Sequence, residues 1–91
     1  MIIIREVFIA KPGMAGKMAK MMKEMMPKSR VMTDLVGQYN TVIVEHESES
    51  MGAFEAEMKK MMEEGGPKPK VEGPSHTEMY TEGRREIFRI W

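Results

Sequence analysis

Residues 30–48, with the sequence RVMTDLVGQYNTVIVEHES, decide the fold of this 91-residue chain. They contain two runs rich in apolar and β-branched residues, 30–37 and 40–48, joined by a Gly-Gln-Tyr-Asn turn. Two such runs around a short turn are typical of a β-hairpin. The sequence therefore predicts two antiparallel strands near the middle of the chain, and the flanking segments determine which sheet they join.

An amphipathic helix is expected on each side of this hairpin. Between residues 14 and 26 the methionines recur in three- and four-residue steps while the lysines lie off that stripe, and Pro27 stops the pattern. After the hairpin, Ser48 or Ser50 can cap a second helix that stops at the glycine pair 65–66. The apolar face of this second helix consists of Met51, Phe54, Met58, Met61 and Met62.

The two ends of the chain supply the remaining strands. Residues 2–10, IIIREVFIA, and 81–91, TEGRREIFRIW, are rich in β-branched and aromatic residues. The resulting order of elements is that of the ferredoxin-like βαββαβ arrangement. We expect one α+β domain over residues 1–91, with a four-stranded antiparallel sheet in the order 4-1-3-2 and both helices on one face. The Pro/Gly/Lys loop 65–75 is interpreted as a pocket lid, followed by a short helical turn near 75–80.

Both faces of this sheet carry apolar side chains when residues are counted alternately along each strand. The count places Ile4, Val44, Met32 and Phe88 on one face, and Ile3, Val7, Ile43, Val31 and Ile87 on the other. Two helices cover only one face, whereas a solvated sheet face is normally polar. A second copy packed sheet against sheet is therefore expected, which gives a two-fold dimeric α/β barrel.

Composition excludes several classes of function. Acidic and basic residues balance at 14 each, so the chain lacks the excess positive charge on which nucleic-acid binding depends. The absence of cysteine excludes disulfides, thiolate catalysis and ordinary zinc-finger sites. The apolar run MIII at residues 1–4 is too short for a membrane span or a signal segment. We expect a cytoplasmic protein with no metal, no membrane partner and no nucleic-acid partner.

Methionine is the one unusual feature of the composition, with 13 residues in the chain and five in KMAKMMKEMM at 17–26. Met fills irregular core space, and it can also line an adaptable surface for an apolar ligand. Copper(I) binding is disfavoured because the sulfurs are spread along a helix without Cys or clustered His. A membrane-surface helix is disfavoured because the same face must cover the sheet. We predict that Met18 and Met25 are core residues and that Met22 lies nearest a pocket.

Four segments, MIIIREVFIAKPG (1–13), TDLVGQYNTVIVEHESES (33–50), FEAEMKKMM (54–62) and GRREIFRIW (83–91), resemble the NIPSNAP-like branch of the dimeric α/β-barrel superfamily. Relatives in this superfamily include antibiotic-biosynthesis monooxygenase-like domains. The resemblance spans nearly the whole chain. It implies a two-fold dimer with a pocket in each protomer between sheet and helices, but it implies no particular reaction. The Asn, Trp and His set of the haem-degrading relatives has no counterpart here, so no cofactor is expected.

The candidates for acid–base chemistry are single ionisable residues that the alternate count places among apolar residues on one face of the sheet. They are Glu86, Glu6, His46 and Asp34, which the strand order would place in a row across the sheet. Such groups either supply a general base beside a pocket or form ion pairs with nearby arginines. His46 is the preferred catalytic candidate, because the ordinary pKa of an imidazole is nearer to neutral pH than that of a carboxyl group. Glu6 is the second candidate.

Three functions remain open at this point. The first is binding of a small apolar or aromatic ligand between sheet and helices by a homodimer. The second is a cofactor-independent monooxygenase that acts on an aromatic substrate, and the third is a structural or interaction module without a ligand. The residues expected to line the pocket are Met18, Met22, Phe54, Met58, Met62, Phe8, Glu86, His76 and Tyr80.

Overall fold

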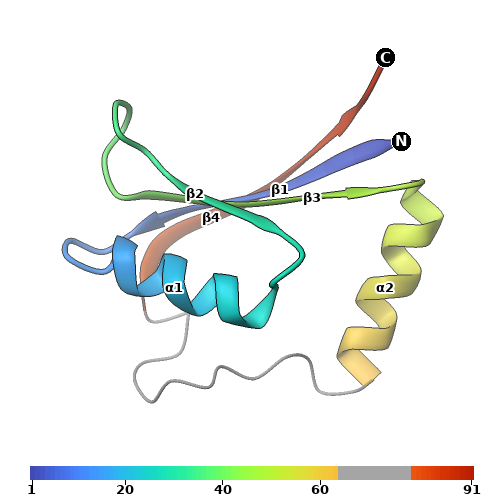
Figure 1. Ribbon diagram of the computed structural model, residues 1–91, viewed down its shortest axis with the longest axis horizontal. Helices are drawn as coiled ribbons and strands as arrows, with labels where there is room; N and C mark the ends of the chain where they lie inside the picture. Colours follow the sequence, from blue (N-terminus) through green and yellow to red (C-terminus); the bar gives the residue numbers. More distant parts are fainter. Residues whose placement is uncertain (64–78) are drawn as a thin grey trace.

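The structure, a computed structural model, describes residues 1–63 and 79–91, except for the side chain of Met62. Its elements are β1 (Ile2–Ala10), α1 (Ala15–Met25), β2 (Arg30–Thr33), β3 (Thr41–Ser48), α2 (Met51–Glu63) and β4 (Tyr80–Arg89). The strands form one antiparallel sheet in the order β2-β3-β1-β4. Both helices lie on the same side of this sheet (Figure 1). The predicted ferredoxin-like α+β arrangement and its strand order are confirmed.

The apolar strand β1 lies at the centre of the sheet because it can bury side chains on both faces. It pairs with β3 on one side and with β4 on the other along nearly its whole length. Ile4 lies opposite His46 of β3 and Ile87 of β4. Its side chain is fully buried beneath the helices. The register therefore brings one residue from each of three strands to the middle of the helix-covered face.

Local hydrogen bonds explain where the helices begin and end. Gly13 has a φ of +80°, a conformation that favours glycine, and it turns the chain from β1 into α1. The Ser50 hydroxyl accepts a hydrogen bond from the amide of Ala53 at 3.1 Å, so Ser50 is the cap of α2. The predicted helix stop at 65–66, the loop 65–75 and most of the turn at 75–80 lie outside the described residues.

The main hydrophobic core lies between α1 and the sheet. Buried methionines of α1 pack with valines of β3 in a cluster of Ala10, Met18, Met21, Met22, Val42, Val44 and Met79. Met18 is fully buried, as its core interpretation requires, and Met25 is half-buried against the same cluster. Met22 is also buried, with only 2% of its surface exposed. This methionine stripe therefore contributes mainly to packing.

Counting alternate residues assigns the side chains of β1 and β3 to the correct faces of the sheet, but it assigns those of β2 and β4 to the wrong faces. Val31 lies opposite Val44, and Ile87 lies opposite Ile4, so both side chains are on the helix-covered face. Met32 and Phe88 consequently lie on the other face. Alternation fixes which residues of one strand share a face, but the connections between strands fix which face that is. Both strands have apolar residues at consecutive positions, so their pattern does not indicate the side.

Strand β2 ends at Thr33 rather than at the predicted residue 37. The Asp34 carboxylate accepts hydrogen bonds from the amides of Tyr39 at 2.7 Å and Thr41 at 3.0 Å, which closes the segment 34–40 into a loop. Tyr39 and Asn40 adopt positive φ values of 69° and 57°. Such left-handed residues are incompatible with a continuing strand. Asp34 is thus a loop-forming residue and not a member of a row across the sheet.

The face turned away from the helices is called here the open sheet face, with the apolar residues Ile3, Val7, Ile9, Met32, Ile43 and Phe88. No helix among the described residues covers it (Figure 1). Val7 is buried, but Ile43 is only half-buried and 46% of the Phe88 surface is exposed. Its central charges are paired within the chain, since Arg5 is 2.9 Å from Glu45. The open sheet face therefore combines these apolar side chains with charged ones, of which Arg5, Arg30, Glu45, Arg84 and Glu86 form ion pairs within the chain.

Candidate functional site

Phe54 determines how α2 sits on the sheet. Only 5% of its surface is exposed, and it is the one buried side chain among those described in α2. Its ring lies 5.9 Å from the His46 ring, measured between centroids, and 5.2 Å from the guanidinium carbon of Arg85. His46 belongs to β3 and Arg85 to β4, so Phe54 bridges the two strands that flank β1. A separate hollow lies on each side of this contact.

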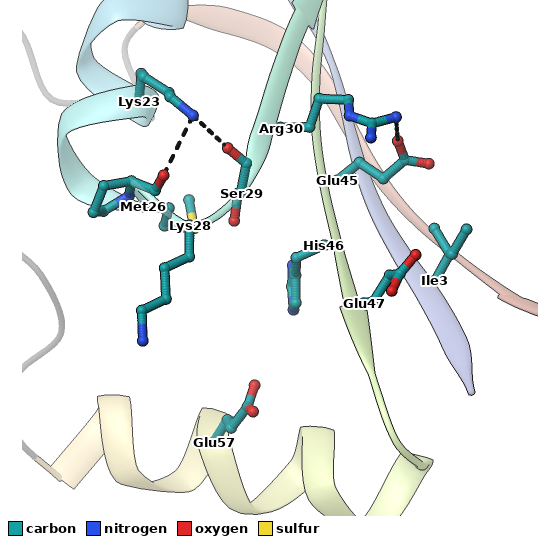
Figure 2. A pocket seen from close by; sticks show the side chains of 11 residues that line it. Ile3, Lys23, Met26, Lys28, Ser29, Arg30, Glu45, His46, Glu47 and Glu57 are labelled. Carbon is teal, nitrogen blue, oxygen red and sulfur yellow. Dashed lines mark hydrogen bonds and ion pairs between the residues drawn. The ribbon is translucent and has the colours of Figure 1, made fainter.

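The larger hollow, called here the His46 pocket, has a volume of about 960 Å³. It lies between the turn after α1, the strand β3 and the helix α2, and it extends around the edge of β3 to Ile3, Glu45 and Glu47 of the open sheet face (Figure 2). Strand β2 begins only at Arg30, opposite Glu45, so residues 46–48 of β3 pair with β1 on one side and with no described strand on the other. The lining residues are Ile3, Lys23, Met26, Pro27, Lys28, Ser29, Arg30, Glu45, His46, Glu47 and Glu57.

Several charges of the His46 pocket are already engaged within the protein. The Lys23 ammonium donates to the carbonyl oxygens of Ser29 at 2.8 Å and Pro27 at 3.3 Å, which fixes the turn after α1. Arg30 lies 3.8 Å from Glu45. Within residues 1–63 and 79–91, by contrast, no hydrogen bond or ion pair engages the charged ends of Lys28, Glu47 and Glu57, of which Glu47 lies on the open sheet face. Among the described residues, the charged ends of Lys28 and Glu57 thus extend from the helix side of the pocket without a partner.

His46 lines this pocket with its ring against Phe54. Its Nδ1 atom is shielded from solvent and has no hydrogen-bond partner among the described residues. A shielded polar atom without a partner is uncommon in proteins, because it loses its hydrogen bonds to water without compensation. Because a shielded atom cannot contact a ligand in the hollow, the ring nitrogen of His46 that is open to it is Nε2.

The smaller hollow, called here the Phe54 pocket, has a volume of about 620 Å³ and lies between α2 and β4. Its apolar lining comes from Met51, Phe54, Met58 and Ile87, and its charged rim from Glu55, Lys59, Glu63 and Arg85. Cavities of this size that combine apolar walls with a few charged groups are typical of small-molecule sites. Two of the residues predicted to line a pocket, Phe54 and Met58, meet here.

Other residues predicted at the site are engaged elsewhere. Glu6 is ion-paired with Arg85, so its carboxylate is occupied. Glu86 lies on the open sheet face, opposite Arg5, and is 3.3 Å from Arg84. The structure therefore does not bring Glu6, Glu86, His46 and Asp34 into one row.

The predicted aromatic residues Phe8 and Tyr80 contact each other at the end of β1 near α1, with ring centroids 4.8 Å apart. Gly83 lies opposite Phe8, and a Cβ atom there would come within 3.2 Å of the Phe8 ring. These residues, like the buried Met18 and Met22, line neither of the two hollows. His76 and the side chain of Met62 lie outside what the structure describes.

The sequence interpretation missed Lys28, Glu57, Arg85 and Ile87 as lining residues. Lys28 and Glu57 resemble ordinary exposed charges in the sequence, and only the turn after Pro27 directs Lys28 toward α2. Arg85 and Ile87 were assigned to the wrong face of β4. The correct register of β4, with Ile87 opposite Ile4, is the signal that would have placed both residues under α2.

The described part of the chain was also searched for other kinds of site. It contains no group of three or more histidine, aspartate or glutamate side chains arranged to hold a metal ion. No helix in residues 1–63 has both the length and the apolar character needed to cross a membrane.

Comparison with known proteins supports the fold. No protein-family model matches the chain, and no curated protein matches it. Among solved structures, the fold is similar to that of an uncharacterised NIPSNAP domain protein from Burkholderia xenovorans, with a TM-score of 0.77 and 12% sequence identity. The match covers 100% of this chain and 95% of the other. The chain therefore has a NIPSNAP-like fold, and the resemblance stated from the sequence is confirmed at the level of fold.

Proposed function

We propose that this protein is a homodimeric binding domain that holds a small apolar or aromatic ligand in the Phe54 pocket. The observation that carries the proposal is the apolar hollow of about 620 Å³ between α2 and β4. Half-buried or exposed methionines at its wall can adapt to the shape of a ring. Arg85 at the rim is ion-paired with Glu6, so the attraction for a ring comes from the apolar walls of the pocket.

The methionines provide a direct test of this site. In protein labelled with ¹³C at the methionine methyl groups, addition of 1-naphthoate is expected to shift the signals of Met51 and Met58. The Met18 signal should remain unchanged, because Met18 is fully buried in the core on α1. Saturable shifts would give a Kd.

An Ile87→Asp variant is expected to weaken naphthoate binding by about tenfold or more, because it removes an apolar wall and adds a negative charge. The matched control is Ala56→Asp, at an exposed position of α2 that does not line the pocket. The proposal would be wrong if naphthoate produced no saturable shift at Met51 and Met58, or if both variants bound it like the parent.

The dimer part of the proposal rests on the open sheet face. Half-exposed apolar side chains such as Ile43 and Phe88 favour burial against another surface. The ion pair between Arg5 and Glu45 means that these two charges near the middle of the face would not be buried unpaired. A second copy of the same face satisfies both conditions in a closed two-fold arrangement.

Sedimentation velocity at micromolar concentration is expected to give twice the 10.5 kDa mass of the chain. An Ile43→Asp variant should sediment as a monomer, because Ile43 lies between Val7 and Met32 on the open sheet face and an unpaired charge is costly to bury. Ala56→Asp adds the same charge on the helix side and should remain dimeric. A monomeric parent protein would overturn the dimer without affecting the ligand proposal.

The monooxygenase alternative requires an aromatic ring and a base in one cavity. His46 lines the charged pocket, whereas the apolar pocket lies beyond Phe54, which favours binding over this reaction. The alternative stays a prediction, and it would be supported by protein-dependent oxygen uptake with an electron-rich naphthol. Failure of a panel of aromatic compounds to raise the melting temperature would instead favour a structural or interaction module.

A further inference from the structure

The His46 pocket contains a pair of opposite charges that face the same space without closing on each other. Lys28 projects from the turn after α1, Glu57 projects from α2, and the His46 ring faces the same space from β3 (Figure 2). No ion pair joins Lys28 to Glu57 in the described part of the chain. Opposite charges that point into one hollow and remain apart leave room for a ligand that bridges them.

The backbone on each side of this hollow is fixed by buried contacts. On the Lys28 side, Ser29 is buried, and its amide donates to the Met26 carbonyl at 3.0 Å. The Lys23 ammonium secures the same turn by its hydrogen bond to the Ser29 carbonyl. On the other side, Glu57 lies one helical turn after the buried Phe54. The fold therefore fixes the backbone positions from which the exposed Lys28 and Glu57 side chains extend.

His46 adds a polar group without a partner beside these charges. Its Nδ1 atom is shielded, so the nitrogen open to the hollow is Nε2, which has no hydrogen-bond partner among the described residues. Since an imidazole can donate a hydrogen bond to an anion, His46 and Lys28 together suit a carboxylate. The Glu57 carboxylate suits an ammonium group. Met26 and Pro27 provide a small apolar wall beside them.

We propose that the His46 pocket is a second ligand site, distinct from the Phe54 pocket, that binds a compact zwitterion of the amino-acid class. Its carboxylate lies against Lys28 and His46, its ammonium against Glu57, and its side chain against Met26 and Pro27. A purely apolar ligand would displace water from the exposed Lys28 and Glu57 without replacing its hydrogen bonds. A simple anion or a simple cation would satisfy only one of them.

The test uses L-leucine and two analogues that each lack one charge. These are 4-methylpentanoate, without the ammonium group, and 3-methylbutylamine, without the carboxylate. Binding is followed through the ring signals of His46 and the ¹³C-methyl signal of Met26. Leucine is expected to shift both signals saturably and to bind about tenfold or more tightly than either analogue, because each lost group removes a charge-assisted hydrogen bond.

Variants assign the two ends of the ligand. Lys28→Ala should weaken leucine binding about tenfold and leave the binding of 3-methylbutylamine unchanged. Glu57→Gln should weaken leucine binding about tenfold and leave the binding of 4-methylpentanoate unchanged. Lys20→Ala and Glu24→Gln change exposed charges of α1 outside both pockets and should have no effect. Shifts at Met51 and Met58 report on the Phe54 pocket separately, so failure at one site is distinguished from failure at the other.

Three results would overturn the proposal. The first is the absence of saturable shifts at His46 and Met26 with leucine. The second is equal binding of leucine and one of its analogues, which would reveal a site for a single charge. The third is unchanged binding in both the Lys28→Ala and Glu57→Gln variants, which would show that these side chains are only solvated surface charges.

Discussion

Replacing Phe54 by alanine is expected to lower the free energy of unfolding by about 3–5 kcal/mol. Phe54 is the one buried side chain among those described in α2, and its ring contacts both His46 and Arg85. The truncation therefore removes the main apolar attachment of α2 to the sheet and leaves a cavity between β3 and β4. Because small domains are stable by only about 5–15 kcal/mol, this loss is a large share of the total. Urea denaturation followed by far-ultraviolet circular dichroism measures it.

Two controls separate the role of the Phe54 ring from general effects on α2. Phe54→Leu retains an apolar branched side chain and should cost less than the alanine substitution. Glu55→Ala changes the next, exposed residue and should alter stability by less than about 0.5 kcal/mol. A Phe54→Ala variant that unfolds at the same urea concentration as the parent would show that other contacts hold α2 in place.

The elements of the fold could be predicted because their apolar residues recur with clear periods. The step of three and four residues between Met14 and Met26 defines α1, and Pro27 limits it. Ser50 begins α2 as one of the two predicted caps. The hairpin and the strands at the two ends of the chain then give the ferredoxin-like order of elements. These features are local, so a single sequence contains the information needed to infer them.

The orientation of β2 and β4 could not be predicted in the same way. Ile87 and Phe88 are adjacent apolar residues, and only the pairing of Ile4 with Ile87 decides which of them faces the helices. In β2, Val31 and Met32 present the same ambiguity. Pairing between strands depends on distant residues and on the loops that join them, such as the loop closed by Asp34.

The candidate site was predictable where a residue type is unusual and not where it is common. His46 and Phe54 stand out in the sequence, and the structure places their rings 5.9 Å apart. Lys28 and Glu57 belong to a chain with 28 charged residues, so nothing in the sequence distinguishes them. Their significance comes from the hollow that two separate elements create between them. A cavity is a property of tertiary packing, and short patterns therefore do not indicate it.

Replacing Met18 by alanine is expected to lower the free energy of unfolding by about 2–5 kcal/mol, whereas Met18→Leu should cost less than about 1.5 kcal/mol. Met18 is fully buried among the methionines of α1 and the valines of β3. Alanine leaves a cavity there, but leucine fills nearly the same volume. Thermal and urea unfolding of the three proteins give the comparison. A Met18→Ala variant that unfolds like the parent would contradict the core assignment.

Met51→Ala is the matched control for the Met18 substitution, and it also tests why the chain contains so many methionines. The Met51 side chain is 45% exposed and lines the Phe54 pocket, so its truncation should change stability by less than about 0.5 kcal/mol. The same substitution should weaken binding of 1-naphthoate if Met51 contacts the ligand. Opposite responses at Met18 and Met51 would show that methionine fills the core on α1 and forms an adaptable binding wall on α2. Equal losses of stability at both positions would mean that methionine serves packing throughout.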